Sequence, residues 1–183
     1  MPRIAPVDTV SADAGVVAAL SAVKAKIGMT PNLFSTLAQS GAALNGYLAF
    51  SDALAKGALT ARQREIVALA VAQANGCEYC LSAHSLMGKG AGLTPDGLRK
   101  AREGTADDAV DAAVARLARR VVDTKGQVLD ADLATARAAG LDDGRLIEIV
   151  ANVAINVLTN YVNNAAHTDI DFPKVALALQ PVG

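Results

Sequence analysis

The chain has 183 residues, a net charge of −1 and a pI of about 6.1. Its length suffices for one domain with a hydrophobic core, and it has no long basic tract of the kind that binds nucleic acid. The first residues, MPRIAPVD, contain no apolar segment typical of a signal peptide. The apolar run at residues 149–158 is interrupted by Asn152 and Asn156 and is shorter than the roughly 20 residues that span a bilayer. We therefore expect a cytoplasmic protein without a membrane segment.

Helices dominate the predicted secondary structure. The hydrophobic fraction is 52%, but only 3% of the residues are aromatic and there is no Trp, so small and aliphatic side chains must form the core. Alanine is abundant and is the best helix former, whereas the alternation typical of strands is absent. The sequence thus predicts an all-α fold, and no linker divides residues 1–183 into separate domains. The predicted helices cover residues 12–27, 30–39, 42–56, 60–74, 78–87, a segment from Pro95, 107–124, 133–139 and 143–166.

Several of these helices have recognisable ends. The pair Thr30-Pro31 combines a capping residue with a proline at the first helical position. The pattern Thr60-x-x-Gln63 is a capping box that opens an apolar stretch. Asn75-Gly76 interrupts this stretch, so we expect a new helix at 78–87, followed by a loop at 88–92.

Two long segments of the chain align with each other at a constant offset of 83 residues. EIVALAVAQANGCEYCLSAH (65–84) matches EIVANVAINVLTNYVNNAAH (148–167) without a gap. The matches indicate an ancient duplication in which the first copy kept the thiols, although two helices rich in Ala and Val can also match by chance. The aligned pairs are Arg62 with Arg145, Glu65 with Glu148, Cys77 with Asn160, Cys80 with Asn163, and His84 with His167.

The second copy carries a polar stripe on an otherwise apolar helix. At about 100° per residue, its members fall within an arc of roughly 120°. Buried polar groups need hydrogen-bond partners, so we expect the stripe to pair with other helices or with a neighbouring subunit. The alternative is that His167 faces the thiol site. The stripe consists of Glu148, Asn152, Asn156, Asn160, Asn163 and His167.

Both cysteines lie in the segment NGCEYCLSAH, together with one of the two histidines. Without an export signal, a C-x-x-C pair is more typical of redox or metal chemistry than of a structural disulfide. The spacing lets the two sulfurs meet across one turn, and His84 lies one helical turn beyond Cys80. Cys77 stands at the predicted helix start, where the dipole and free N–H groups lower a thiol pKa. His84 can accept and return a proton.

Glu65 joins this site only if the chain reverses at Asn75-Gly76. On one straight helix it would lie about 28 Å from His84, whereas a reversal brings the two residues level. A carboxylate there could orient and charge the imidazole, as the acid behind a catalytic histidine does. The alternative is that Glu65 forms a buried ion pair with Arg62 or Arg64.

The pattern E-x11-C-x-x-C-x3-H resembles the motif of the alkylhydroperoxidase D (AhpD) / carboxymuconolactone decarboxylase superfamily, and the helical context is similar from residues 30–33 to 172–173. The resemblance implies an AhpD-like helical bundle with an N-terminal helical extension over about residues 1–40, and a homo-oligomer, commonly a trimer or hexamer. It also implies an antioxidant peroxidase that reduces organic hydroperoxides through a dithiol–disulfide cycle. Such an enzyme uses a dithiol or protein reductant and needs no metal or cofactor. The motif residues, implied to be catalytic, are Glu65, Cys77, Cys80 and His84.

The resemblance assigns a role to each member of the motif. Cys80 attacks the hydroperoxide and Cys77 resolves the sulfenic acid, whereas the helix-start argument favours Cys77 as the more acidic thiol, so the order stays open. In the best-known branch a His precedes the second cysteine, and this chain has Tyr79 there, so one relay member is replaced. Superfamily members that decarboxylate lactones lack the cysteine pair, which argues against that reaction here.

Two other functions fit the same residues. The two cysteines, His84 and His167 form a Cys2His2 set for zinc, although zinc fingers use small ββα units rather than a helical bundle. A non-catalytic assembly or stress-response protein could instead use the disulfide to signal redox state. In either case, the high apolar content predicts helix surface buried between identical subunits, with the N-terminal helices and the long C-terminal helix as candidates.

Overall fold

A computed structural model describes residues 1–179, and every regular element within them is a helix. The all-α prediction is therefore confirmed. The helices are α1 (Ala14–Ile27), α2 (Asn32–Leu37), α3 (Gly41–Ala55), α4 (Ala61–Ala74), α5 (Glu78–Gly90), α6 (Pro95–Arg102), α7 (Ala109–Asp123), α8 (Asp130–Ala138) and α9 (Asp143–Ala166).

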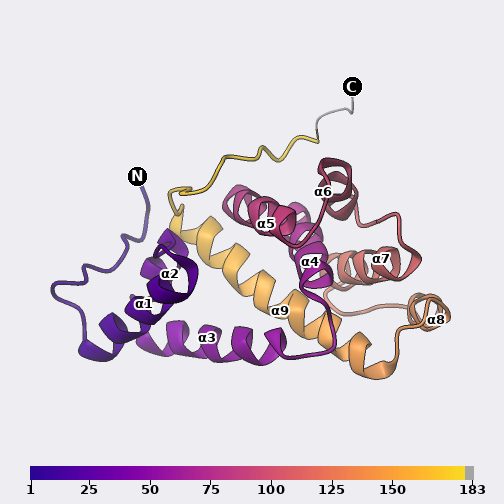
Figure 1. The fold of residues 1–183 in the computed structure, drawn as a ribbon, viewed down its shortest axis with the longest axis horizontal. Helices are drawn as coiled ribbons and strands as arrows, with labels where there is room; N and C mark the ends of the chain where they lie inside the picture. The colour runs from indigo at the N-terminus through magenta and orange to yellow at the C-terminus, as the bar shows by residue number, and fades with distance from the viewer. Residues whose placement is uncertain (180–183) are drawn as a thin grey trace.

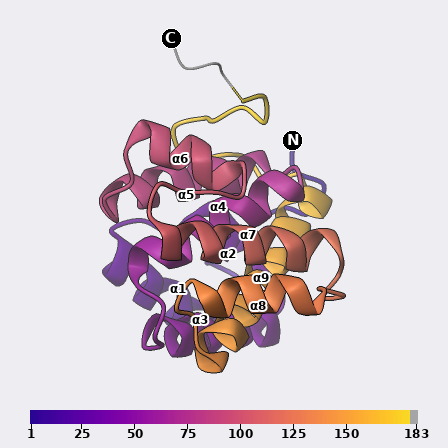
Figure 2. The same cartoon turned by 90° about the vertical axis from the view of Figure 1, so that its right-hand side faces the viewer.

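The long helix α9 crosses the middle of the molecule, with α1, α2 and α3 on one side and α4 to α8 on the other (Figure 1). A view turned by 90° shows α7 and α8 as an outer layer over α4 and α9 (Figure 2). By length and composition alone α9 could cross a membrane, since it extends beyond the apolar run seen in the sequence. Half of its most apolar window is buried against the other helices, which is the environment of a core helix.

Helix α4 is the most enclosed element, because α5, α6, α7 and α9 all pack around it. Every residue from Ile66 to Ala72 is buried, as expected for a helical segment that is apolar on all faces. Its N-terminus carries the predicted capping box, in which the Thr60 hydroxyl accepts from the Gln63 N–H and the Gln63 side chain accepts from the Thr60 N–H. This cap fixes the start of α4, and Glu65 lies just after the first turn.

Most helix ends lie within one or two residues of the predicted ones, and α8 begins three residues earlier than expected. Two other differences have a visible cause in the structure. Helix α2 begins one residue later than expected, because the carboxylate of Asp171 accepts the Asn32 N–H at 2.7 Å and takes over the capping role predicted for Thr30. Helix α5 runs on to Gly90 through part of the predicted loop 88–92. Gly88 is buried in that added turn, and a Cβ there would lie 2.9 Å from the Leu98 side chain, so the small residue lets α5 and α6 approach closely.

Candidate active site

The predicted break at Asn75-Gly76 is present and reverses the chain between α4 and α5. Gly76 adopts a φ of 63°, a left-handed conformation that favours glycine. The Gly76 and Cys77 N–H groups return to the carbonyls of Gln73 and Ala72, which is the Schellman pattern of a helix end. Cys77 is then the N-cap of α5, so one residue closes the first helix and opens the second.

The reversal brings Glu65 and His84 into direct contact. The His84 Nδ1 atom lies 2.8 Å from the Glu65 carboxylate, and the two side chains are 19% and 18% exposed. An ionised carboxylate can only accept, so Nδ1 is the donor and Nε2 is left to accept a proton. Burial opposes protonation of His84, but the charge and hydrogen bond of Glu65 outweigh it and raise its pKa.

The alternative partners of Glu65 are occupied elsewhere. Arg62 donates to Asp111 at 2.8 Å, and Arg64 donates to the Leu59 carbonyl at 2.6 Å. Glu65 therefore pairs with the imidazole rather than with an arginine of its own helix.

The two thiols lie side by side in the protein interior. Their Sγ atoms are 2.6 Å apart, both cysteines are free thiols, and Cys77 and Cys80 are only 0% and 2% exposed. The Cys80 N–H donates to the Cys77 sulfur at 3.3 Å, as it would to any N-cap side chain. The sulfurs therefore need little movement to form a disulfide.

The environment makes Cys80 the more acidic thiol. The hydrogen bond from Cys77, the charge of His84 and the amides of α9 lower the pKa of Cys80 to about 7, although burial acts in the opposite direction. The same hydrogen bond, together with burial, raises the pKa of Cys77. Once one of two touching thiols ionises, the second cannot do so easily. The helix-start argument for Cys77 is thus outweighed by these contacts, of which the hydrogen bond between the two thiols has the largest effect.

Two amides of α9 complete the surroundings of Cys80. The Asn163 Nδ2 atom donates to the Cys80 sulfur at 3.3 Å, and Asn160, which is fully buried, also lowers the pKa of Cys80. The Asn160 Oδ1 atom accepts from the Asn75 side chain at 3.0 Å, which orients the amide. Part of the polar stripe therefore does face the thiol site, but through asparagines whose role the sequence analysis did not identify.

We expect Asn163→Leu to raise the pKa of Cys80 by about one unit, because a hydrogen bond to the thiolate is lost. The pH dependence of thiolate ultraviolet absorbance measures this shift. Asn164→Ala is the matched control, since Asn164 is exposed and donates to the Asn75 carbonyl rather than to sulfur. An unchanged titration in Asn163→Leu would contradict the assigned contact.

The remaining members of the stripe lie away from the sulfurs. His167 is the exposed, left-handed C-cap of α9, so it does not face the thiol site. Glu148 accepts the N–H groups of Ala58 and Leu59 at 2.8 and 3.0 Å.

Among residues 1–179, no three Cys, His, Asp or Glu side chains come together as a metal site. The duplication stays a prediction, because the first copy is split into two helices and the second is one continuous helix.

Tyr79, at the position of the replaced relay histidine, has a structural role. Its hydroxyl accepts the Leu33 N–H at 3.1 Å, and its ring packs edge-on against Phe172 with centroids 5.6 Å apart. Burial raises the pKa of Tyr79, and nearby Asp171 raises it further. The side chain therefore joins α2 to the C-terminal segment.

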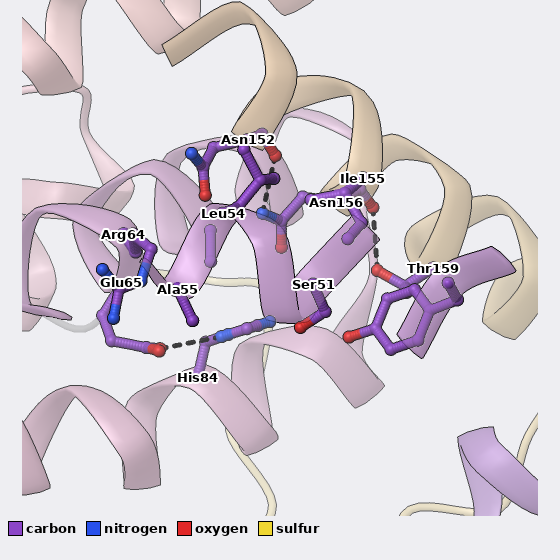
Figure 3. Close-up of a pocket in the computed structure, with 12 residues that line it drawn as sticks. Ser51, Leu54, Ala55, Arg64, Glu65, His84, Asn152, Ile155, Asn156 and Thr159 are labelled. Carbon is purple, nitrogen blue, oxygen red and sulfur yellow. Dashed lines mark hydrogen bonds and ion pairs between the residues drawn. The ribbon is translucent and has the colours of Figure 1, made fainter. Parts of the chain in front are cut away.

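A cavity of about 120 Å³ opens beside the Glu65–His84 pair, between α3, α4, α5 and α9. In Figure 3, His84 lies between Glu65 on one side and Ser51 on the other. The wall also carries Tyr47, a residue without a signal in the sequence, whose pKa is raised to about 12 by burial. Neither cysteine lines this cavity, so a small molecule in it would meet the imidazole of His84 first. Cys80 lies close enough to His84 for the charge of each to shift the pKa of the other.

Comparison with known proteins is consistent with the motif. Residues 41–124 match the sequence model of the carboxymuconolactone decarboxylase family, and this segment contains all four motif residues. No curated protein matches the chain.

Several solved structures share the fold. An AhpD-core, peroxidase-related protein from Ralstonia eutropha JMP134 has a TM-score of 0.84 and 26% identity, covering 93% of this chain and 92% of the other. A peroxidase-related protein from Silicibacter sp. TM1040 has a TM-score of 0.78 and 22% identity over 91% of both chains. The debrominase Bmp8, crystallised with 2,3,4-tribromopyrrole, has a TM-score of 0.77 and 17% identity, covering 92% and 91%.

Proposed function

We propose that this chain, which belongs to the AhpD-like superfamily, is a thiol-dependent peroxidase that reduces organic hydroperoxides by a dithiol–disulfide cycle. The observation that carries the proposal is the contact between Cys77 and Cys80 at 2.6 Å, next to a His84–Glu65 pair at 2.8 Å. A thiolate, a proton acceptor and a resolving thiol are the groups that this reaction needs.

The first step breaks the peroxide bond. His84 takes the proton of Cys80, with Glu65 stabilising the imidazolium. The Cys80 thiolate attacks the terminal oxygen of the hydroperoxide, so that an S–O bond forms while the O–O bond breaks. The leaving alkoxide takes the proton back from His84 and departs as the alcohol. Cys80 is now a sulfenic acid.

The second step forms the disulfide. The Cys77 sulfur attacks the sulfenic sulfur of Cys80, the S–S bond forms, and the hydroxyl leaves with the Cys77 proton as water. A dithiol reductant then supplies two electrons and two protons to restore both thiols. Because the two sulfurs are only 2.6 Å apart, we expect disulfide formation to precede a second oxidation by free peroxide. A reducing cytoplasm is the compartment that maintains the reduced form.

The fold by itself does not select this reaction, since a debrominase is among the similar structures. The cysteine pair argues against lactone decarboxylation. The zinc alternative lacks support, because His167 is at the exposed end of α9. A non-catalytic redox sensor would hold the same dithiol, and turnover distinguishes it from a peroxidase.

The proposal is tested by coupling hydroperoxide loss to oxidation of several dithiol donors, dihydrolipoamide among them. We expect multiple turnovers with wild type and none with Cys77→Ser/Cys80→Ser. Equal activity in the double variant would exclude the cysteine pair as the site. A single disulfide formed without further turnover would instead favour the sensor.

We also propose a homo-oligomer. Helix α3 has only one fully buried residue, Leu44, and α9 exposes Ile147 (70%) and Tyr161 (59%) on its outer side. Apolar helix surface of this kind is commonly covered by another subunit. We expect light scattering at micromolar concentration to give a multiple of 18.6 kDa. A mass of one chain would show that these faces stay exposed.

A further inference from the structure

The cavity beside His84 contains one cation that the proposed reaction does not use. Arg64 lines the wall together with Glu65 and His84, and apolar side chains such as Leu54 and Ile155 form much of the rest. Figure 3 shows Arg64 on the same side of the cavity as Glu65. The Glu65 carboxylate is already paired with His84, whose Nδ1 atom lies at 2.8 Å. Arg64 is therefore the positive group that a molecule in this cavity would meet.

Arg64 has no carboxylate partner in the part of the chain that the structure describes. Its guanidinium donates to the Leu59 carbonyl at 2.6 Å, and no Asp or Glu oxygen of residues 1–179 lies within 4.0 Å of it. Its neighbour Arg62, by contrast, is paired with Asp111 at 2.8 Å. A guanidinium carries five N–H donors, so most of those of Arg64 remain for a ligand.

The position of Arg64 is fixed by a chain of contacts from α9. Glu148 accepts the N–H groups of Ala58 and Leu59, which fixes the loop before α4. A Cβ on Gly57 would lie 2.5 Å from the Glu148 carboxylate, so this close approach depends on glycine. The fixed Leu59 carbonyl then anchors the guanidinium. A cation held in place before binding loses less entropy when it engages an anion.

We propose that Arg64 is an anion subsite of this cavity and that the substrate is a small organic hydroperoxide that carries a carboxylate. This inference rests on the proposed peroxidase function and specifies its substrate. The cavity of about 120 Å³ has room for several water molecules, so it suits a short organic molecule. Arginine forms charge-assisted, bidentate bonds with carboxylates, and such a bond would direct the peroxide group towards His84.

A matched pair of hydroperoxides tests the subsite. 2-Hydroperoxy-2-methylpropanoate and its carboxamide have nearly the same shape and differ in charge. We expect wild type to prefer the acid in kcat/KM. Arg64→Gln should lower kcat/KM for the acid by about 10- to 100-fold, mainly through KM, and leave the amide nearly unchanged. The preference should also fall as salt is added.

The control is Arg62→Gln, which removes an arginine of the same helix that is already paired with Asp111. We expect it to keep the wild-type preference for the acid. Equal losses for acid and amide in Arg64→Gln, or no preference in wild type, would overturn the subsite while leaving the peroxidase function intact.

A second measurement tests the anion subsite at Arg64 without requiring catalytic turnover. Iodoacetate and iodoacetamide alkylate thiolates and again differ mainly in charge. We expect both to reach Cys80 past His84, from the cavity that Arg64 lines. The ratio of the iodoacetate rate to the iodoacetamide rate, followed by mass spectrometry of the Cys80 adduct, should fall about tenfold or more in Arg64→Gln. An unchanged ratio would refute the subsite. If hydroperoxides are not reduced but this ratio falls, the peroxidase function fails and the anion subsite remains.

Discussion

Cys80→Ser is expected to abolish hydroperoxide turnover. The hydroxyl that replaces the thiol has no accessible anion at neutral pH, whereas the pKa of Cys80 is lowered to about 7, so about half of the enzyme holds the reactive thiolate at that pH. The wild-type rate of reaction with hydroperoxide should therefore rise with pH through about 7, as protons leave Cys80. Stopped-flow measurement of thiol oxidation checks both the loss and the pH dependence.

Cys77→Ser should give a different result from the same assay. Cys80 still attacks the first equivalent of hydroperoxide, but no second thiol lies within reach to resolve the sulfenic acid. We expect one turnover, a sulfenic acid on Cys80 that a dimedone-type reagent traps, and slow over-oxidation. If sulfenic acid instead accumulated on Cys77 in Cys80→Ser, the assignment of the two thiols would be reversed.

His84→Gln and Glu65→Gln should each slow the reaction by about 10²–10⁴-fold, the range typical of general acid–base groups. His84→Gln removes both the proton acceptor and a charge that lowers the pKa of Cys80. The rise in rate should therefore move to higher pH in this variant. Glu65→Gln keeps the imidazole but no longer stabilises its charged form, and the pKa of His84 should fall. Single-turnover rates measured across pH follow both effects.

Tyr79→Phe is the control for these two variants. It keeps the edge-on contact with Phe172 and loses only the hydroxyl that accepts the Leu33 N–H, at a cost of about 1 kcal/mol in stability. Its turnover should stay close to wild type. A loss as large as that of His84→Gln would place Tyr79 in the proton relay and contradict its structural role.

Local patterns in the sequence predicted most of the fold. Helix periodicity, the capping box at Thr60 and the break at Asn75-Gly76 depend on neighbouring residues, and the structure confirms all three. The same local rules failed at α2, where the cap comes from Asp171, far away in the sequence. They also failed at Gly88, which lies buried inside α5 next to Leu98 instead of opening a loop.

For the candidate site too, some features follow from the sequence and others only from the tertiary structure. The spacing of Cys77, Cys80 and His84 places them on two successive turns of one helix, so the sequence by itself determined that these groups lie close together. The lower pKa of Cys80 comes mainly from the hydrogen bond of Cys77 and the charge of His84, both within the same helical segment. Tertiary packing adds to it, because Asn163 reaches Cys80 only when α9 packs against α5. The position of Arg64 likewise depends on Glu148 of α9. Residue types and spacings specify which groups can react, whereas pKa values and cavity charge depend on distances that only tertiary packing sets.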